Sequence, residues 1–199
     1  MKARRSSLLA LALVLVSLLA LAACGGSSAV ASSPTATPSP SATPLVNTVY
    51  TSTDGAYSIK IAATWKTEAL DVPSTTGGVS IVNAANTDAM LVEPFTFRTS
   101  ATAQSILGSA ISDPSSFTGS KVDATTTTKT YPSGSWTVAT ATTTTASTTG
   151  DGAALNARLY MTEHGGHTVV IITLAQTGSR ADDQATYFDP MLMSFTFLK

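Results

Sequence analysis

The stretch HGGHTVVIITLA, residues 164–175, decides the fold of this chain. Gly165 and Gly166 predict a two-residue hairpin turn, because glycine tolerates the positive φ values that such turns require. Residues 168–175 then read as a strand, and the run Val-Val-Ile-Ile within it is apolar on both faces. We therefore expect this strand at the centre of a sheet.

More strands precede this hairpin. Residues 155–162 alternate apolar and polar side chains, as a strand with one packed face does. Residues 121–130 and 135–145 are rich in Thr, whose branched Cβ fits a pleated sheet, and the turn Tyr-Pro-Ser-Gly at 131–134 joins them. A second turn, at 149–152, leads into the strand 155–162. Together with the hairpin, these segments predict a four-stranded antiparallel meander.

The first half of the domain contributes shorter strands and a helix. We expect strands at 57–61, 79–82 and 90–97, the first of them preceded by an Asp-Gly turn at 54–55. Apolar residues then fall at positions i, i+3, i+4, i+7 and i+8 over residues 103–111, which predicts an amphipathic helix.

A second helix is expected near the end of the sequence. Ser179 begins it, and Asp182 and Asp183 lie in its first turn, where carboxylates interact favourably with the helix dipole. Its buried side is predicted to consist of Tyr187, Phe188, Met191, Leu192 and Phe195. The order of elements indicates an α+β domain, an antiparallel β-sheet of about six to seven strands with two helices packed on it.

Residues 1–23 have the pattern of a bacterial signal peptide. Three basic residues lie among the first five, and an apolar run follows that is too short for a membrane span. The sequence Leu21-Ala22-Ala23-Cys24 resembles the lipobox of bacterial lipoproteins, which implies cleavage before Cys24 and lipidation of that residue. An ordinary secretory signal with a coincidental cysteine is the alternative.

Residues 24–44 are predicted to form a tether between this anchor and a domain at residues 45–199. The tether contains Gly, Ser, Ala, Thr and closely spaced Pro, but no charged residue, and serves as a spacer or as a leader of no fixed length. Residues 24–199 hold 8 Lys and Arg against 12 Asp and Glu, so acyl chains rather than charge would attach the protein to anionic lipid. We expect the protein on the extracytoplasmic face of the cell membrane.

Several functions are disfavoured by composition and motifs. A net charge of −1 gives no basic surface for nucleic acid. The sequence contains no Gly-x-Ser-x-Gly elbow, no phosphate-binding glycine loop and no dinucleotide fingerprint. With Cys24 lipidated, no thiol remains for catalysis or metal binding. We therefore predict that the protein is not an enzyme and assign it no catalytic residue and no cofactor.

The predicted hairpin carries a candidate metal site. If Gly165 and Gly166 form the turn, His164 and His167 face each other with Cβ atoms about 5 Å apart. Two imidazoles so placed suit zinc or copper, but Glu163 points to the other face and a third ligand must come from elsewhere. A polar, solvated hairpin tip is the alternative interpretation.

A second candidate site lies between the sheet and a covering helix. Arg158, Tyr160 and Trp136 are predicted to line a ligand pocket there, with Arg158 as the partner of an anionic group. Trp136 is alternatively a core residue.

The order of elements resembles the PsbP-like family. The resemblance spans about residues 50–198 and rests on Tyr57, Trp65, the helix in the middle of the chain, the Thr-rich meander and the aromatic residues of 187–188 and 194–197. It implies a PsbP-like α-β-α sandwich, similar to LpqN-type lipoproteins, and a docking role rather than catalysis. Ala62-Ala63-Thr64 departs from the family, since many members have a proline before the tryptophan. A photosynthetic role does not follow from fold alone.

Two functions of different classes follow from these patterns. The first is a membrane-anchored accessory module that docks to a partner protein. The second is a carrier that binds a small molecule or metal and delivers it to a transporter. A concave pocket at Arg158 would favour the carrier, and an exposed apolar surface would favour docking.

Overall fold

The computed structural model describes residues 47–70, 72, 74–113, 116–146 and 152–199. The expected signal peptide, Cys24 and tether lie outside these residues, as does most of the turn expected at 149–152. No helix within the described part of the chain is both long enough and apolar enough to cross a membrane.

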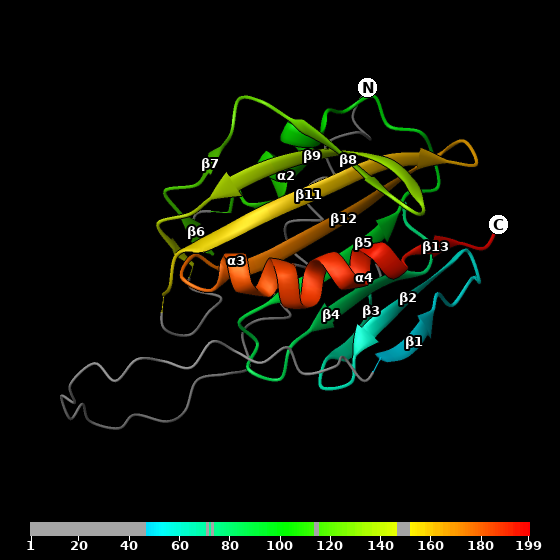
Figure 1. Cartoon of the computed structure of the whole chain (residues 1–199). Helices are drawn as coiled ribbons and strands as arrows, with labels where there is room; N and C mark the ends of the chain where they lie inside the picture. Colours follow the sequence, from blue (N-terminus) through cyan, green and yellow to red (C-terminus); the bar gives the residue numbers. More distant parts are fainter. Residues whose placement is uncertain (1–46, 71, 73, 114–115, 147–151) are drawn as a thin grey trace.

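An antiparallel sheet forms the middle of the domain (Figure 1). Its strands follow the order β3-β4-β5-β12-β11-β9-β7, and β8 also pairs with β9. The strands are β3 (Lys66–Leu70), β4 (Gly78–Val82), β5 (Ala89–Pro94), β7 (Lys121–Val122), β8 (Thr127–Tyr131), β9 (Gly134–Thr142), β11 (Leu155–His164) and β12 (His167–Gln176).

The β12 strand lies at the centre of this order, as predicted. It pairs with β5 on one side and β11 on the other, and residues 168–175 are all buried. Val170, Ile172 and Leu174 belong to the apolar cluster on one face, whereas Val169 and Ile171 belong to the cluster on the opposite face. Because both faces of β12 are apolar, both faces of the sheet must be covered by other elements.

Helices cover the two faces. The α2 helix (Ala103–Ala110) buries Ala103, Ile106, Leu107 and Ala110 against one face. The opposite face is covered by α3 (Arg180–Asp183), η2 (Gln184–Phe188) and α4 (Asp189–Ser194), which run in front of the sheet in Figure 1. The prediction of an α+β fold with two helical layers on an antiparallel sheet is confirmed, although the sheet has more strands than expected.

A small second sheet completes the same layer as α4. It has the order β1-β2-β13, with strands β1 (Asn47–Thr51), β2 (Tyr57–Ala62) and β13 (Thr196–Phe197). Tyr57, Ile59 and Ile61 of β2 join the apolar cluster beneath α4. The β13 strand therefore places the end of the chain beside the turn that precedes β2.

Some of the predicted strands have different bounds. The single strand expected at 121–130 is wrong: this segment forms β7 and β8, which pair with different parts of β9. The strand expected at 135–145 ends at Thr142, and Thr145–Ala146 (β10) pairs instead with Phe117–Thr118 (β6). Thr favours extended backbone at every position of this region, so its pattern does not mark where a strand breaks.

The terminal helix also departs from a regular α-helix. It passes through a π-helical segment, in which the Asp189 amide donates to the Gln184 carbonyl. Pro190 explains the change, because its ring lacks an N–H and clashes with the carbonyl four residues earlier. Ser179 begins the helix as predicted but makes no side-chain capping hydrogen bond.

One carboxylic acid lies inside the apolar core under α2. Glu93 is 1% exposed, and no hydrogen bond reaches its Oε2. Its neighbour across the strands, Val170, belongs to the apolar cluster of that face. Burial raises the pKa of Glu93 to about 8, so its proton is held more tightly in the folded state than in the unfolded chain.

We predict that Glu93 makes the protein less stable as the pH rises. Because its folded pKa exceeds its unfolded value, its contribution is most favourable below about pH 4.5 and is lost as the pH approaches 8. Between pH 5 and 8, Glu93 should lower the free energy of unfolding of the wild type by an amount on the order of 4 kcal/mol. Glu93→Gln should lack this decrease, because glutamine does not titrate. Urea denaturation measures it, with Glu68→Gln on exposed β3 as the control. Parallel curves for wild type and Glu93→Gln would contradict this prediction.

Candidate functional site

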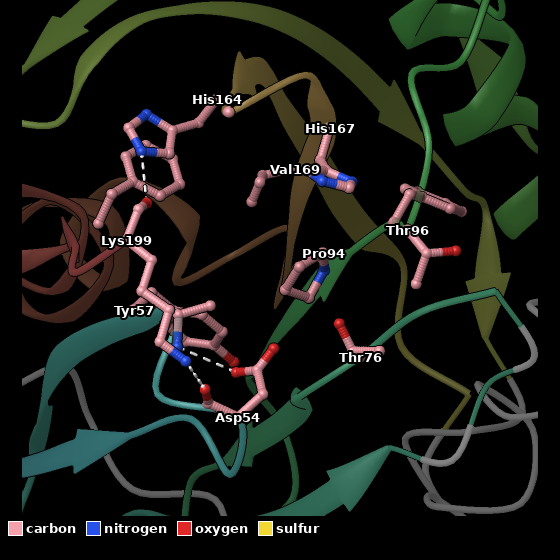
Figure 2. Close-up of a pocket in the computed structure, with 13 residues that line it drawn as sticks. Asp54, Tyr57, Thr76, Pro94, Thr96, His164, His167, Val169 and Lys199 are labelled. Carbon is pink, nitrogen blue, oxygen red and sulfur yellow. Dashed lines mark hydrogen bonds between the residues drawn. The ribbon is translucent and has the colours of Figure 1, made fainter.

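A surface pocket of about 320 Å³ lies at one end of the domain (Figure 2). Five segments that are distant in sequence form it: the turn before β2, Thr76 before β4, the end of β5, the β11–β12 hairpin and the residues of and after β13. Apolar side chains line much of its inside, among them Tyr57, Pro94, Val169 and Phe197. This volume is near the lower limit of small-molecule sites and also suits one large side chain.

The hairpin at this pocket forms as predicted. His164 and His167 are paired directly across the strands, and Gly165 and Gly166 adopt φ values of 57° and 81°. Positive φ at both positions is the requirement of a two-residue type I′ turn, which explains why glycine occupies both. The turn thus places two imidazoles at the pocket.

An aromatic stack fixes one of these imidazoles. The ring of His164 lies parallel to Phe197, with 3.9 Å between centroids and 3° between planes. Trp136 stacks in nearly the same orientation, with its centroid 6.3 Å from that of Phe197. The Nε2 atom of His164 is also 2.8 Å from the backbone oxygen of Lys199. These contacts hold the chain after β13 against the hairpin, where it forms one wall of the pocket.

Asp54 and its turn lie beside Lys199 in the lining (Figure 2). Lys199 Nζ donates a hydrogen bond to the backbone oxygen of Asp54, so Lys199 connects the hairpin to this turn. The Ala56 amide donates to Asp54 Oδ1 at 3.0 Å. Burial raises the pKa of Asp54, but hydrogen bonds from Ser52, Ala56 and Thr76 together lower it more, so its pKa lies below the usual value. Donors of its own chain thus hold the Asp54 carboxylate ionised.

The metal site predicted at the hairpin requires His164 and His167 to be neighbours, and this requirement is met. His164 and His167 are paired directly across the strands, but their rings point apart in Figure 2, and the Nε2 of His164 contacts the Lys199 oxygen. Among the residues that the structure describes, no three His, Cys, Asp or Glu side chains are grouped as a metal site would require. The hairpin alone supplies two ligands, fewer than a tight zinc site uses.

Two of the three residues of the second predicted site, Trp136 and Tyr160, belong to the packed core. Trp136 and Tyr160 are 1% and 0% exposed, and both belong to the apolar cluster beneath the terminal helix. Trp136 Nε1 donates to Ser133 Oγ, and Tyr160 OH accepts from Gln184 Nε2. Arg158 is half-buried on β11 beside Thr140 and Thr173. None of the three predicted residues lines the pocket at the hairpin.

A buried polar cluster lies between this core and the terminal helix. Arg180 donates to Thr173 Oγ1 and Gln184 Oε1, at 2.8 and 2.7 Å, and its guanidinium lies 5.1 Å from the centre of the Phe188 ring. Burial, with the nearby charge of Arg158, lowers the pKa of Arg180 to about 10. Thr173 and Gln184 are near Arg180 in the sequence, but no local pattern predicts the cluster, because Asp88 and Tyr160 reach it from distant strands.

Carboxylic acids balance part of this buried charge. Asp88 is buried at the start of β5, and burial together with the neighbouring Asp183 raises its pKa to about 6, against the opposing effect of Arg180. The role expected for Asp183, interaction with the helix dipole, is thus accompanied by a contact with Asp88 on the sheet. This cluster is covered by the helix, so we interpret it as a structural link between helix and sheet.

Removal of this arginine should destabilise the domain. Arg180→Met would remove the buried hydrogen bonds to Thr173 and Gln184 and the positive charge near Asp88 and Asp183. We expect a loss of about 3 kcal/mol in the free energy of unfolding at pH 7. The matched control is Arg98→Met, since the Arg98 side chain is 71% exposed and pairs with Glu163 at the surface. That substitution should cost less than about 1 kcal/mol. Equal losses in urea denaturation of the two variants would refute the assigned role of Arg180.

Comparison with known proteins identifies the class of fold. No protein-family model and no curated protein matches the sequence. Among solved structures, this chain is similar to cyanobacterial PsbP (CyanoP) from Synechocystis sp. PCC 6803, with 10% identity over 89% of this chain and 98% of CyanoP, and a TM-score of 0.54. The Saccharomyces cerevisiae Ran-binding protein Mog1p gives 10% identity over 78% of this chain and 97% of Mog1p, with a TM-score of 0.50.

These similarities establish a PsbP-like fold. LpqN, a protein involved in cell envelope biogenesis of Mycobacterium tuberculosis, is 10% identical over 76% of this chain and 90% of LpqN. Its TM-score is 0.45, and the assignment of the fold does not depend on it. Identities of this size describe a shared architecture, and function must be argued from the site.

The sequence predicted only part of the pocket. It identified the hairpin and its two histidines, because the Gly-Gly turn is a local signal. It missed the contributions of Asp54, Tyr57, Phe197 and Lys199, since only the pairing of β13 with β2 brings these residues to the hairpin. The aromatic ending at Phe195 and Phe197 supports the resemblance to the PsbP-like family, but nothing in the sequence assigns it to a site.

Proposed function

We propose that this chain is an extracytoplasmic lipoprotein whose PsbP-like domain is a non-catalytic accessory module. In this proposal the pocket at the β11–β12 hairpin docks a segment of a partner protein. The observation that carries it is an open, largely apolar pocket at the end of the domain, next to an exposed aromatic side chain. The accessory role is also consistent with the PsbP-like fold.

The apolar surface around the pocket favours a protein partner over a small molecule. Phe95 lines the pocket, and the Phe97 ring packs on it with 5.5 Å between centroids. Phe97 is nevertheless 44% exposed. A small molecule within the pocket would leave Phe97 in water, whereas a protein segment can fill the pocket and cover the adjoining ring.

Delivery of a small molecule to a transporter is the second candidate function. The observation in its favour is the pocket volume of about 320 Å³, which is sufficient for a small ligand. The site expected for that role, around Arg158, instead contributes Tyr160 and Trp136 to the core. A ligand retained by the purified protein in native mass spectrometry, and absent from a Thr96→Trp variant with a filled pocket, would favour this second function.

A cell-based crosslinking experiment tests the docking function. With Phe97→p-benzoylphenylalanine, ultraviolet irradiation should give one discrete adduct with a membrane or envelope protein. Thr96→Trp in the same chain should abolish it, because the new indole fills the pocket. The control, Thr128→p-benzoylphenylalanine on exposed β8, should not give that adduct. The same adduct from both positions, or an adduct that persists with Thr96→Trp, would contradict docking at this pocket.

The membrane anchor is proposed from the lipobox alone. Cys24 is the single cysteine of the chain and directly follows Leu21-Ala22-Ala23. We expect wild-type protein to incorporate an alkyne-labelled palmitate and to fractionate with membranes, and Cys24→Ser to lose both properties. Ser28→Ala, four residues further along, is the matched control and should retain them. Label in Cys24→Ser protein would show that the anchor lies elsewhere.

A further inference from the structure

The lining of the pocket is specific enough to suggest what kind of segment it binds. Three of its side chains are aromatic, Tyr57, Phe95 and Phe197, and they come from separate parts of the fold. Tyr57 is held in place by a 2.8 Å hydrogen bond from its hydroxyl to the Gly77 carbonyl. Phe197 is fixed between His164 and Trp136. Rigid aromatic walls of this kind suit a large apolar side chain, above all an aromatic one, because aromatic rings pack in preferred offset and edge-to-face geometries.

The charged groups at the pocket favour an anionic neighbour of that side chain. Lys199 is exposed, and its Nζ contacts a neutral backbone oxygen, so within the described part of the chain it takes part in no ion pair. His164 and His167 add two nitrogen-bearing rings: His164 lies beside Lys199, and His167 lies across the pocket from it (Figure 2). Imidazole and ammonium groups donate their strongest hydrogen bonds to carboxylates.

The acidic group at the pocket does not cancel this preference. Asp54 is the carboxylate among the lining residues, and its Oδ1 accepts a hydrogen bond from the Ala56 amide. Its remaining partners include the Ser52 and Thr76 side chains. Donors of its own turn thus satisfy Asp54, whereas the ring of His167 and the ammonium of Lys199 can turn to a ligand.

Resting on the docking function proposed above, the geometry points to a partner segment with a large apolar side chain beside a carboxylate. The apolar side chain fills the pocket between Tyr57, Phe95 and Phe197. The carboxylate, from an Asp or Glu next to it in the partner's chain, accepts hydrogen bonds from Lys199 and His167. The apolar group supplies most of the affinity, and the charge pair selects the register and the partner.

Selection from a random twelve-residue peptide library displayed on phage tests this inference. The target is the full chain purified in detergent, and the Thr96→Trp variant removes peptides that bind elsewhere. We expect the enriched peptides to share a Trp, Phe, Tyr or Leu within two residues of an Asp or Glu. Enriched peptides without a neighbouring acid, or no enrichment over Thr96→Trp, would overturn the inference.

The affinities of one enriched peptide, made synthetically, for the wild type and its variants then distinguish the apolar pocket from the groups that bind the carboxylate. Lys199→Gln and His167→Gln should each weaken binding about fivefold, and Thr96→Trp by more than tenfold. Replacing the acidic residue of the peptide by its amide should weaken binding to the wild type about fivefold. The same change should hardly affect binding to Lys199→Gln, because that variant already lacks the pair between Lys199 and the carboxylate. Lys66→Gln and Thr128→Trp, exposed and distant, are the charge and size controls.

The outcomes distinguish this inference from the function on which it rests. If Thr96→Trp abolishes binding while Lys199→Gln, His167→Gln and the amide peptide bind as well as their parents, the carboxylate is refuted and docking at the pocket stands. If Thr96→Trp binds like wild type, the pocket is not the docking site and both proposals fail. Melting temperatures of the variants within a few degrees of wild type exclude loss of fold as the cause.

Discussion

The burial of β12 on both faces is the constraint on which the rest of the structure depends. Eight successive residues, 168–175, are buried in a strand that hydrogen bonds to a neighbour on either side. Such a strand is stable only if each face of the sheet is covered, and α2 covers one face while the terminal helix and the small sheet cover the other. The path of the chain after β12 is therefore set by the need to cover β12 itself.

The same constraint produces the pocket. After covering the sheet, the chain ends in β13, which pairs with β2 and places Phe197 against His164 at the tip of the β11–β12 hairpin. Lys199 then joins the hairpin to the turn at Asp54. The pocket lies where the two sheets meet at this end of the domain. Ring stacking and hydrogen bonds hold these segments together, as the docking function proposed for this pocket requires.

Local patterns in the sequence predicted much of this fold. The apolar run of β12, the Gly-Gly turn and the helical spacing of α2 each depend on neighbouring residues, and all three were located correctly. Long-range pairing was not predictable in the same way. The β1, β3 and β13 strands are short, and their pairing depends on tertiary contacts rather than on a local pattern. The predicted pocket is wrong for Tyr160 and Trp136, because the sequence does not show that the terminal helix covers and buries them.

Oxidative footprinting in intact cells, compared with the purified protein, tests the central claim most directly, because it measures which side chains a partner covers without an inserted probe. The account predicts that Phe97 and His167, both exposed in the isolated domain, are protected in cells. Met193 on α4, exposed and outside the pocket lining, should be oxidised equally in both samples. Equal oxidation of Phe97 and His167 in cells and in the purified protein would contradict a docking function for this pocket.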